Sequence, residues 1–86
     1  MPSVQIYTWS NCPYCVRAKD LLTRKGVKFS EINLDGQDEE LKELRNRTGL
    51  RTVPQIFIND RFVGGYTDLA DLDSKGELDR MLSASP

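Results

Sequence analysis

Residues 10–15 read Ser10-Asn11-Cys12-Pro13-Tyr14-Cys15 and hold both cysteines of the chain. A short apolar segment precedes them and the apolar stripe of a helix follows them, so the motif is expected at a helix start. Pro13 suits the first position of a helix, where its missing N–H costs nothing, and Ser10 or Asn11 can cap the helix from outside. Cysteines three positions apart on a helix share one face, close to the reach of a disulfide.

Cys12 is expected at the N-terminal end of this helix, where free backbone N–H groups and the helix dipole favour an anion. The thiolate is such an anion and is the reactive form of cysteine, so a lowered pKa is predicted for Cys12. Cys15 lies further into the helix and is expected to be less exposed, with a higher pKa. The motif therefore predicts thiol–disulfide redox chemistry.

Three other interpretations of the cysteine pair remain open. A structural disulfide between residues three apart would close a very short loop and would therefore stabilise the fold little. A zinc site within one chain needs about four ligands. Because the chain has no histidine and no third cysteine, only a metal or cluster site shared between chains is left. Inert, buried thiols are disfavoured because Asn11, Pro13 and Tyr14 indicate an exposed helix start.

The composition is that of one small globular domain covering residues 1–86. Its net charge of -1, from 12 basic and 13 acidic residues, provides no basic excess for nucleic acid. No apolar run approaches the 18 or so residues of a membrane span. The first residues also lack the pattern of a secretory signal. With the Cys-X-X-Cys spacing, these features predict a cytoplasmic protein without nucleic-acid or membrane partners.

Hydrophobic patterning predicts strands and helices in alternation along the chain. Strands are expected over residues 4–7, 27–34, 55–58 and 61–63, with a hairpin turn at Asn59-Asp60. One helix is expected after Pro13, a second over residues 39–48, and a last helical region from Thr67, interrupted at residues 74–76. The strand–helix–strand unit implies that the first two strands are parallel. The order β-α-β-α-β-β-α predicts an α/β fold with one sheet covered by helices.

Two further segments suggest a binding site. In Thr52-Val53-Pro54, the proline is either a strand-entry residue or a cis proline that presents the Val53 backbone to an extended peptide. Gly64-Gly65 is either a simple turn or the approach to a helix start at Thr67-Asp68. At such a start, free N–H groups can hold a carboxylate and an acidic side chain can hold an ammonium. The end of a free α-amino acid carries both groups.

Three segments together resemble the signature segments of the dithiol glutaredoxins: Cys12-Pro13-Tyr14-Cys15, Thr52-Val53-Pro54-Gln55-Ile56-Phe57-Ile58 and Gly64-Gly65-Tyr66-Thr67-Asp68-Leu69. The similarity spans essentially the whole chain and is greatest to the short, single-domain bacterial type. Cys-Pro-Tyr-Cys distinguishes this class from thioredoxins, which carry Cys-Gly-Pro-Cys, and from the monothiol Cys-Gly-Phe-Ser class. The resemblance implies a thioredoxin fold with a four-stranded mixed sheet flanked by helices, a cis Pro54 and glutathione as the reductant.

The resemblance also implies a role for each matching residue. Cys12 is expected to be the nucleophile and Cys15 the resolving thiol, and the supporting active-site residues are Pro13, Tyr14 and Pro54. The glutathione-binding residues that it implies are Tyr14, Arg51, Thr52, Val53, Pro54, Gly65, Thr67 and Asp68. Among them, the Val53 backbone is expected to pair with the cysteinyl part of glutathione, and Asp68 to face the ammonium of the γ-glutamyl end.

One position departs from the family pattern. Many relatives have a lysine three residues before the first cysteine, facing the glycine carboxylate of glutathione, whereas this chain has Trp9. Arg51 matches a basic position found in part of the family and can serve in place of the lysine; the other interpretation is a solvated surface arginine. Trp9 is expected either to form a flat apolar wall beside the site or to pack against the first helix.

The implied activity is the reduction of protein disulfides and protein–glutathione mixed disulfides, with no metal. The implied partners are glutathione and glutathionylated or disulfide-containing proteins, with ribonucleotide reductase and arsenate reductase as family-level possibilities, and the chain is expected to be a monomer. The alternative is a carrier in which two chains share a [2Fe–2S] cluster through Cys12 and two glutathiones. Pro13 counts against it, because relatives that hold clusters usually have a smaller or more flexible residue there.

Overall fold

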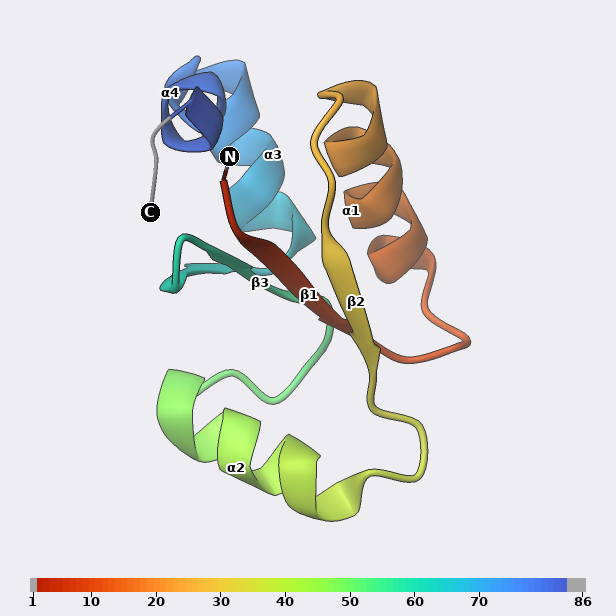
Figure 1. Ribbon diagram of the computed structural model, residues 1–86. Helices are drawn as coiled ribbons and strands as arrows, with labels where there is room; N and C mark the ends of the chain where they lie inside the picture. The colour runs from red at the N-terminus through yellow and green to blue at the C-terminus, as the bar shows by residue number, and fades with distance from the viewer. Residues whose placement is uncertain (1, 84–86) are drawn as a thin grey trace.

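A four-stranded mixed sheet with helices on both faces is present in the computed structural model, which describes residues 2–83 (Figure 1). The elements, in chain order, are β1 (Val4–Thr8), α1 (Pro13–Arg24), β2 (Ser30–Asn33), α2 (Asp38–Thr48), β3 (Gln55–Ile58), β4 (Arg61–Gly64), α3 (Tyr66–Ser74) and α4 (Glu77–Ser83). None of these helices within residues 2–83 combines the length and the apolar character that crossing a bilayer requires.

The strand order β2-β1-β3-β4 brings the loops of the candidate site together. β1 pairs in parallel with β2 and antiparallel with β3, and β3 pairs antiparallel with β4. Tyr7, near the end of β1, therefore lies opposite Gln55, the first residue of β3. The loop after β1, which carries the cysteines, thus lies beside the loop that precedes β3. The predicted parallel pairing and the mixed four-stranded sheet are both confirmed.

Each face of the sheet packs against its own helices. Figure 1 shows α1, α3 and α4 on one side of the sheet and α2 on the other. The first core comprises Val4, Ile6, Ala18, Leu21, Leu22, Ile56, Ile58, Leu69 and Leu78. The second core comprises Cys15, Leu34, Leu44, Val53 and Phe57. Full burial of a leucine or isoleucine side chain contributes about 1.5–3 kcal/mol, so the two cores hold the sheet and helices in place.

Two elements differ from the sequence predictions by more than a one-residue shift of an end. A strand is predicted over residues 27–34, but β2 covers only Ser30–Asn33, because the ladder pairs these residues with residues 5–8 of the short strand β1. Val27 and Phe29 lie outside the ladder and pack against the first core. The last helical region consists of two helices, α3 and α4, which separate at Lys75-Gly76 as the predicted interruption indicates. The element order therefore ends with two helices instead of one.

Candidate active site

The cysteine motif forms the start of α1. Cys12 is the N-cap residue, with extended backbone angles (φ −141°, ψ 100°), and Pro13 follows at the beginning of the helix. The Cys12 sulfur accepts a hydrogen bond from the backbone N–H of Cys15 at 3.1 Å, which satisfies one free donor of the helix start. The expectation that Ser10 or Asn11 caps this helix is wrong. With Pro13 in the first helical position, the cap falls on Cys12 itself.

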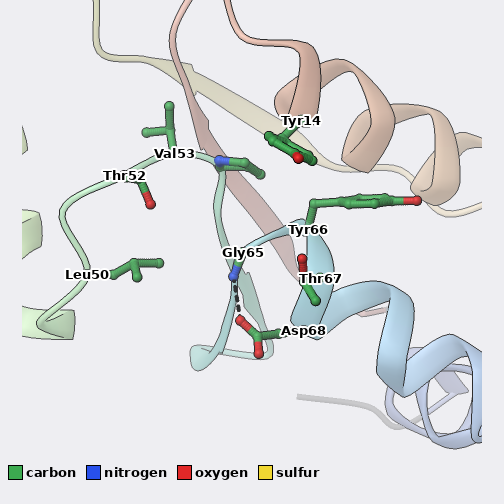
Figure 2. A pocket seen from close by; sticks show the side chains of 9 residues that line it. Tyr14, Leu50, Thr52, Val53, Gly65, Tyr66, Thr67 and Asp68 are labelled. Carbon is green, nitrogen blue, oxygen red and sulfur yellow. Dashed lines mark hydrogen bonds between the residues drawn. The ribbon is translucent and has the colours of Figure 1, made fainter.

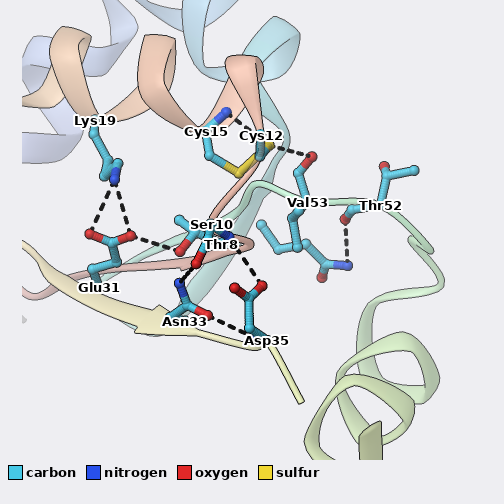
Figure 3. The surroundings of a disulfide bond; sticks show 11 residues. Thr8, Ser10, Cys12, Cys15, Lys19, Glu31, Asn33, Asp35, Thr52 and Val53 are labelled. Carbon is cyan, nitrogen blue, oxygen red and sulfur yellow. Dashed lines mark hydrogen bonds and ion pairs between the residues drawn. A yellow bond between two sulfur atoms is a disulfide. The ribbon is translucent and has the colours of Figure 1, made fainter. Parts of the chain in front are cut away.

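The two cysteines form a disulfide but differ in exposure (Figure 3). Their Cα atoms are 5.2 Å apart, within the usual range for a disulfide. Cys15 is 1% exposed and belongs to the second core, whereas Cys12 is only partly buried. The carbonyl oxygen of Val53 lies 3.8 Å from the Cys12 sulfur. A sulfur atom of another molecule can therefore reach Cys12 more easily than Cys15.

A polar network holds the segment that precedes the cysteines (Figure 3). The backbone N–H of Ser10 donates to the Asp35 carboxylate at 3.1 Å, and the Asn33 side chain donates to the Ser10 hydroxyl at 3.0 Å. The Asp35 N–H in turn donates to the side-chain oxygen of Asn33 at 2.8 Å. Hydrogen bonds from the side chain and the backbone of Ser10 keep the pKa of Asp35 below its ordinary value. The network is therefore charged at neutral pH.

A second network connects α1 and β2 to the end of β1. The buried Thr8 hydroxyl donates to the Glu31 carboxylate at 2.7 Å, and Lys19 of α1 pairs with the same carboxylate at 3.1 Å. The hydrogen bond from Thr8, and after it the contact with Lys19, lower the pKa of Glu31. These contacts fix α1 against the point where β1 ends and the cysteine loop begins.

A groove beside the cysteines is formed by three separate segments of the chain (Figure 2). Its volume is about 210 Å³, and its lining residues are Tyr14, Leu50, Thr52, Val53, Pro54, Gly65, Tyr66, Thr67 and Asp68. The Val53–Pro54 peptide bond is cis, as predicted. Tyr14 and Tyr66 both line the groove, and their ring centroids are 6.2 Å apart. The groove thus joins the active-site helix, the loop before β3 and the start of α3.

The N-terminus of α3 supplies the polar part of this groove. Gly65 is the N-cap residue, and its backbone N–H donates to the carboxylate of Asp68 at 3.0 Å. The free N–H groups and the dipole at a helix start attract a carboxylate. The exposed Asp68 side chain adds a negative charge that can attract an ammonium. The start of α3 can therefore attract the carboxylate of a free α-amino acid, and Asp68 can attract its ammonium.

A buried side chain holds the loop that carries Thr52 and Val53. Gln55 is 0% exposed, and its Nε2 donates to the backbone carbonyls of Leu50 at 2.8 Å and Thr52 at 3.1 Å. Its Oε1 accepts a hydrogen bond from the Thr48 hydroxyl at 2.8 Å. A polar residue within a strand pattern gives no sequence signal for such a role, because its partners are mostly backbone atoms of a loop. Gln55 was accordingly not predicted as a site residue.

The structure brings most of the predicted glutathione-binding residues together. Seven of the eight line the groove: Tyr14, Thr52, Val53, Pro54, Gly65, Thr67 and Asp68. Arg51 does not; it is exposed and lines a separate hollow with Lys42 and Arg45 of α2. Leu50 and Tyr66 also line the groove, although neither is predicted as a site residue. Each is adjacent in the sequence to a predicted residue.

Trp9 lies outside the groove. It packs against the second core, which contains Cys15, and lines a different hollow with Asp35 and Leu41. Trp9 is partly buried on the α2 side of the sheet, and it does not line the groove beside the cysteines.

Comparisons with known proteins agree on one family. The glutaredoxin family model matches residues 4–63. A glutaredoxin of Pseudomonas aeruginosa is 55% identical over 84 residues, which are 98% of this chain and 100% of the relative. Glutaredoxin 3 of Escherichia coli strain K12 is 50% identical over 82 residues, 95% of this chain and 99% of the relative. The crystal structure of a buckwheat glutaredoxin–glutathione complex has a TM-score of 0.90 and 31% identity, covering 93% of this chain and 76% of that one.

The sequence and the fold therefore lead to the same assignment. The match to solved glutaredoxins confirms the predicted thioredoxin fold. Within residues 2–83 and these comparisons, no observation favours the alternative of a [2Fe–2S] carrier. The chain belongs to the glutaredoxin family and is a glutathione-dependent thiol–disulfide oxidoreductase.

Proposed function

We propose that this glutaredoxin reduces protein–glutathione mixed disulfides and protein disulfides, with Cys12 as the nucleophile and Cys15 as the resolving thiol. The observation that carries the proposal is the position of the Cys12 sulfur. Cys12 is a partly exposed residue, and its sulfur caps the N-terminus of α1 and lies 3.8 Å from the carbonyl oxygen of the groove residue Val53. A mixed disulfide that reaches Cys12 can therefore place its glutathione half in the groove.

Cys12 is suited to act as a thiolate once the disulfide is reduced. Its sulfur lies 3.1 Å from the backbone N–H of Cys15, and the first turn of α1 contains no acidic residue that would oppose a negative charge. A hydrogen-bond donor and a helix N-terminus both stabilise a thiolate, so we expect the reduced form of Cys12 to have a lowered pKa. Burial has the opposite effect on Cys15, so we expect Cys15 to keep the higher pKa.

The monothiol route needs Cys12 alone. The Cys12 thiolate attacks the glutathione sulfur of a protein–glutathione disulfide, the S–S bond breaks, and the protein leaves as a thiolate that takes up a proton. A second glutathione thiolate then attacks the glutathione sulfur bound to Cys12, which releases glutathione disulfide and regenerates the Cys12 thiolate. A low-pKa Cys12 favours both steps, because it is a populated nucleophile and a good leaving group.

The dithiol route needs both cysteines. The Cys12 thiolate attacks a protein disulfide and forms a mixed disulfide, and one substrate thiol is released. The Cys15 thiolate then attacks the Cys12 sulfur, which releases the second substrate thiol and leaves the Cys12–Cys15 disulfide. Two glutathione molecules reduce this disulfide and are themselves oxidised to glutathione disulfide. The disulfide in the structure corresponds to the oxidised enzyme of this route.

We expect glutathione to occupy the groove with its cysteinyl part against the backbone of Val53, beside Thr52 and the cis Pro54. The γ-glutamyl carboxylate is expected at the N-terminus of α3, near Gly65 and Thr67, and its ammonium near Asp68. The position of these groups along one groove supports this arrangement. The buckwheat relative was solved as a glutathione complex, which supports glutathione as the ligand.

The glycine end of glutathione is assigned to Arg51 within the same proposal. Arg51 is exposed and directly precedes Thr52, which lines the groove. A guanidinium at this point can turn toward a carboxylate that leaves the groove along the loop. We expect a cytoplasmic monomer that acts on glutathionylated or disulfide-containing proteins, with ribonucleotide reductase and arsenate reductase as candidate substrates.

The test is turnover of a glutathionylated peptide and of a protein disulfide, coupled to glutathione reductase and NADPH. Cys12→Ser is expected to abolish both activities, whereas Cys15→Ser keeps the first and loses the second. Loss of both activities in Cys15→Ser would contradict the division of roles. A wild type that is inactive with glutathione but is reduced by thioredoxin reductase would overturn the assignment of the groove.

A further inference from the structure

We propose that Gln55 is a positioning residue for glutathione: together with Thr48 it sets the orientation of the backbone N–H of Val53 in the groove. The inference rests on the proposed function, since it assumes that glutathione pairs with the Val53 backbone. Gln55 itself does not line the groove, so it would act only through the loop between α2 and β3.

The first step is the set of contacts that Gln55 makes. All three hydrogen bonds of its side chain go to residues 48–52: to the Leu50 carbonyl at 2.8 Å, the Thr52 carbonyl at 3.1 Å and the Thr48 hydroxyl at 2.8 Å. The Thr48 hydroxyl also accepts a hydrogen bond from the Leu50 N–H at 3.2 Å. Two side chains thus hold one N–H and two carbonyl groups of a loop that has no regular secondary structure.

The second step concerns the cost of placing an amide in the core. Gln55 is 0% exposed and lies in β3, between β1 and β4, on the face that carries Phe57 and the second core. A buried amide is costly unless its donors and acceptor are paired. Two of its partners, the Leu50 and Thr52 carbonyls, lie in the loop, and the third, Thr48, is the last residue of α2. The backbone of Gln55 belongs to the ladder with β1. The loop is therefore tied to a strand in the interior of the sheet.

The third step joins these contacts to the reacting sulfur. The Thr52 carbonyl and the Val53 N–H belong to one planar peptide group and point in opposite directions. A hydrogen bond from Gln55 that fixes the Thr52 carbonyl therefore also fixes the direction of the Val53 N–H. The Val53 carbonyl, in the next peptide group, lies 3.8 Å from the Cys12 sulfur. The Gln55 amide thus determines how the backbone beside Cys12 is presented to a ligand.

The experiment uses Gln55→Met, which keeps the length and apolar bulk of the side chain but removes its donor and acceptor groups. We expect the dissociation constant for S-methylglutathione, measured by NMR titration of the reduced protein, to rise about tenfold. A factor of this size corresponds to the loss of one hydrogen bond, here the one that orients the Val53 N–H toward the ligand. The midpoint of the pH profile of Cys12 alkylation by iodoacetamide is expected to stay unchanged, because the start of α1 and the Cys15 N–H, which stabilise the thiolate, are not altered. Thr48→Val is expected to weaken binding to a smaller extent.

The matched control is Ile58→Val, which removes a buried methylene from the same strand without touching the loop. The inference is overturned if Gln55→Met binds S-methylglutathione as tightly as the wild type does. It is also overturned if Ile58→Val loses as much affinity as Gln55→Met. If Gln55→Met does not fold, Thr48→Val decides by the same measurement, and unchanged affinity then overturns the inference. A wild type that does not bind S-methylglutathione refutes the proposed glutathione groove itself, and this inference with it.

Discussion

The carboxylate of Asp68 occupies the place that a Cβ atom on Gly64 would take. Gly64 is buried at the end of β4 and has φ +123°, a conformation that strains a residue with a side chain. We therefore expect Gly64→Ala to lower the free energy of unfolding by about 2 kcal/mol, measured by urea denaturation. Because Asp68 must move, the affinity for glutathione is expected to fall as well.

The control for this substitution is Gly76→Ala. Gly76 has φ +75°, but no atom lies within 4 Å of the position that a Cβ would take. Gly76→Ala therefore shares with Gly64→Ala the strain of a positive φ but not the contact with Asp68. Gly76→Ala is expected to lower stability and to leave the affinity for glutathione unchanged. An equal loss of affinity in both variants would mean that the contact with Asp68 is not the cause.

The charge of Asp68 is expected to matter more for glutathione than its capping role. Asp68→Asn keeps an oxygen that can accept the Gly65 N–H, but it removes the partner of the ligand's ammonium. We expect KM for a glutathionylated peptide to rise about tenfold, with little change in kcat or thermal stability. Asp71→Asn removes the same charge from an exposed position of α3 outside the groove, and its KM should match the wild type.

The contact between Thr8 and Glu31 is expected to make stability depend on pH. The folded pKa of Glu31 lies below its ordinary value of 4.5, so its contribution is present above pH 4.5 and is lost as the pH falls through the folded pKa. Thr8→Val removes the hydroxyl at nearly constant shape and is expected to cost about 1 kcal/mol at neutral pH. The cost should shrink in urea denaturation at a pH below the folded pKa of Glu31, where its carboxyl group is protonated.

Thr23→Val is the control for this pH dependence. The Thr23 hydroxyl donates to the backbone carbonyl of Lys19 within α1, so no titrating group accepts its hydrogen bond. Its effect on stability should be the same at both pH values. If the loss of stability in Thr8→Val does not change with pH, the hydrogen bond from Thr8 does not stabilise the ionised form of Glu31.

Lys25 is expected to stabilise the docking of α1 against α3 and α4. Its ammonium pairs with Asp73 and, at 3.1 Å, with Asp79, and the hydrogen bonds to Asp73 and then Asp79 raise its pKa above the ordinary 10.5. A raised pKa means that the stabilisation is present below pH 10.5 and is lost as the pH rises through the folded pKa. Lys25→Met should therefore lower Tm at neutral pH, with a smaller difference from wild type in high salt or strong alkali. The exposed Lys28→Met serves as the control, and an equal drop in Tm there would contradict the role of the ion pairs.

Most of the fold could be predicted from local sequence patterns, because the signals lie within a few residues of one another. The Cys12-Pro13 pair indicates the start of α1, Gly49 indicates the end of α2, and Asn59-Asp60 indicates the hairpin turn; the last two positions have the left-handed backbone angles that such turns need. Around Pro54 and Asp68, local patterns suggest a binding site but leave a strand-entry proline and a simple turn open, and the resemblance to a family favours the site.

The remaining features depend on contacts between distant segments, which no local pattern encodes. The length of β2 is set by the length of β1, so an apolar pattern that begins at Val27 overestimates the strand. The role of Gln55 arises from loop carbonyls that the fold brings to it. Trp9 occupies the place of the family's lysine in the sequence, but its large ring packs against the second core and does not line the groove.

That position of Trp9 gives the protein an optical signal of its own oxidation state. Trp9 is the only tryptophan of the chain, and it packs against the cluster that contains Cys15. A disulfide quenches the fluorescence of a nearby indole by accepting an electron from its excited state, whereas two thiols quench it less. Emission from the unlabelled protein should therefore rise on reduction. Following that emission across a series of glutathione buffers would give the redox potential of the Cys12–Cys15 pair without a dye or a partner enzyme.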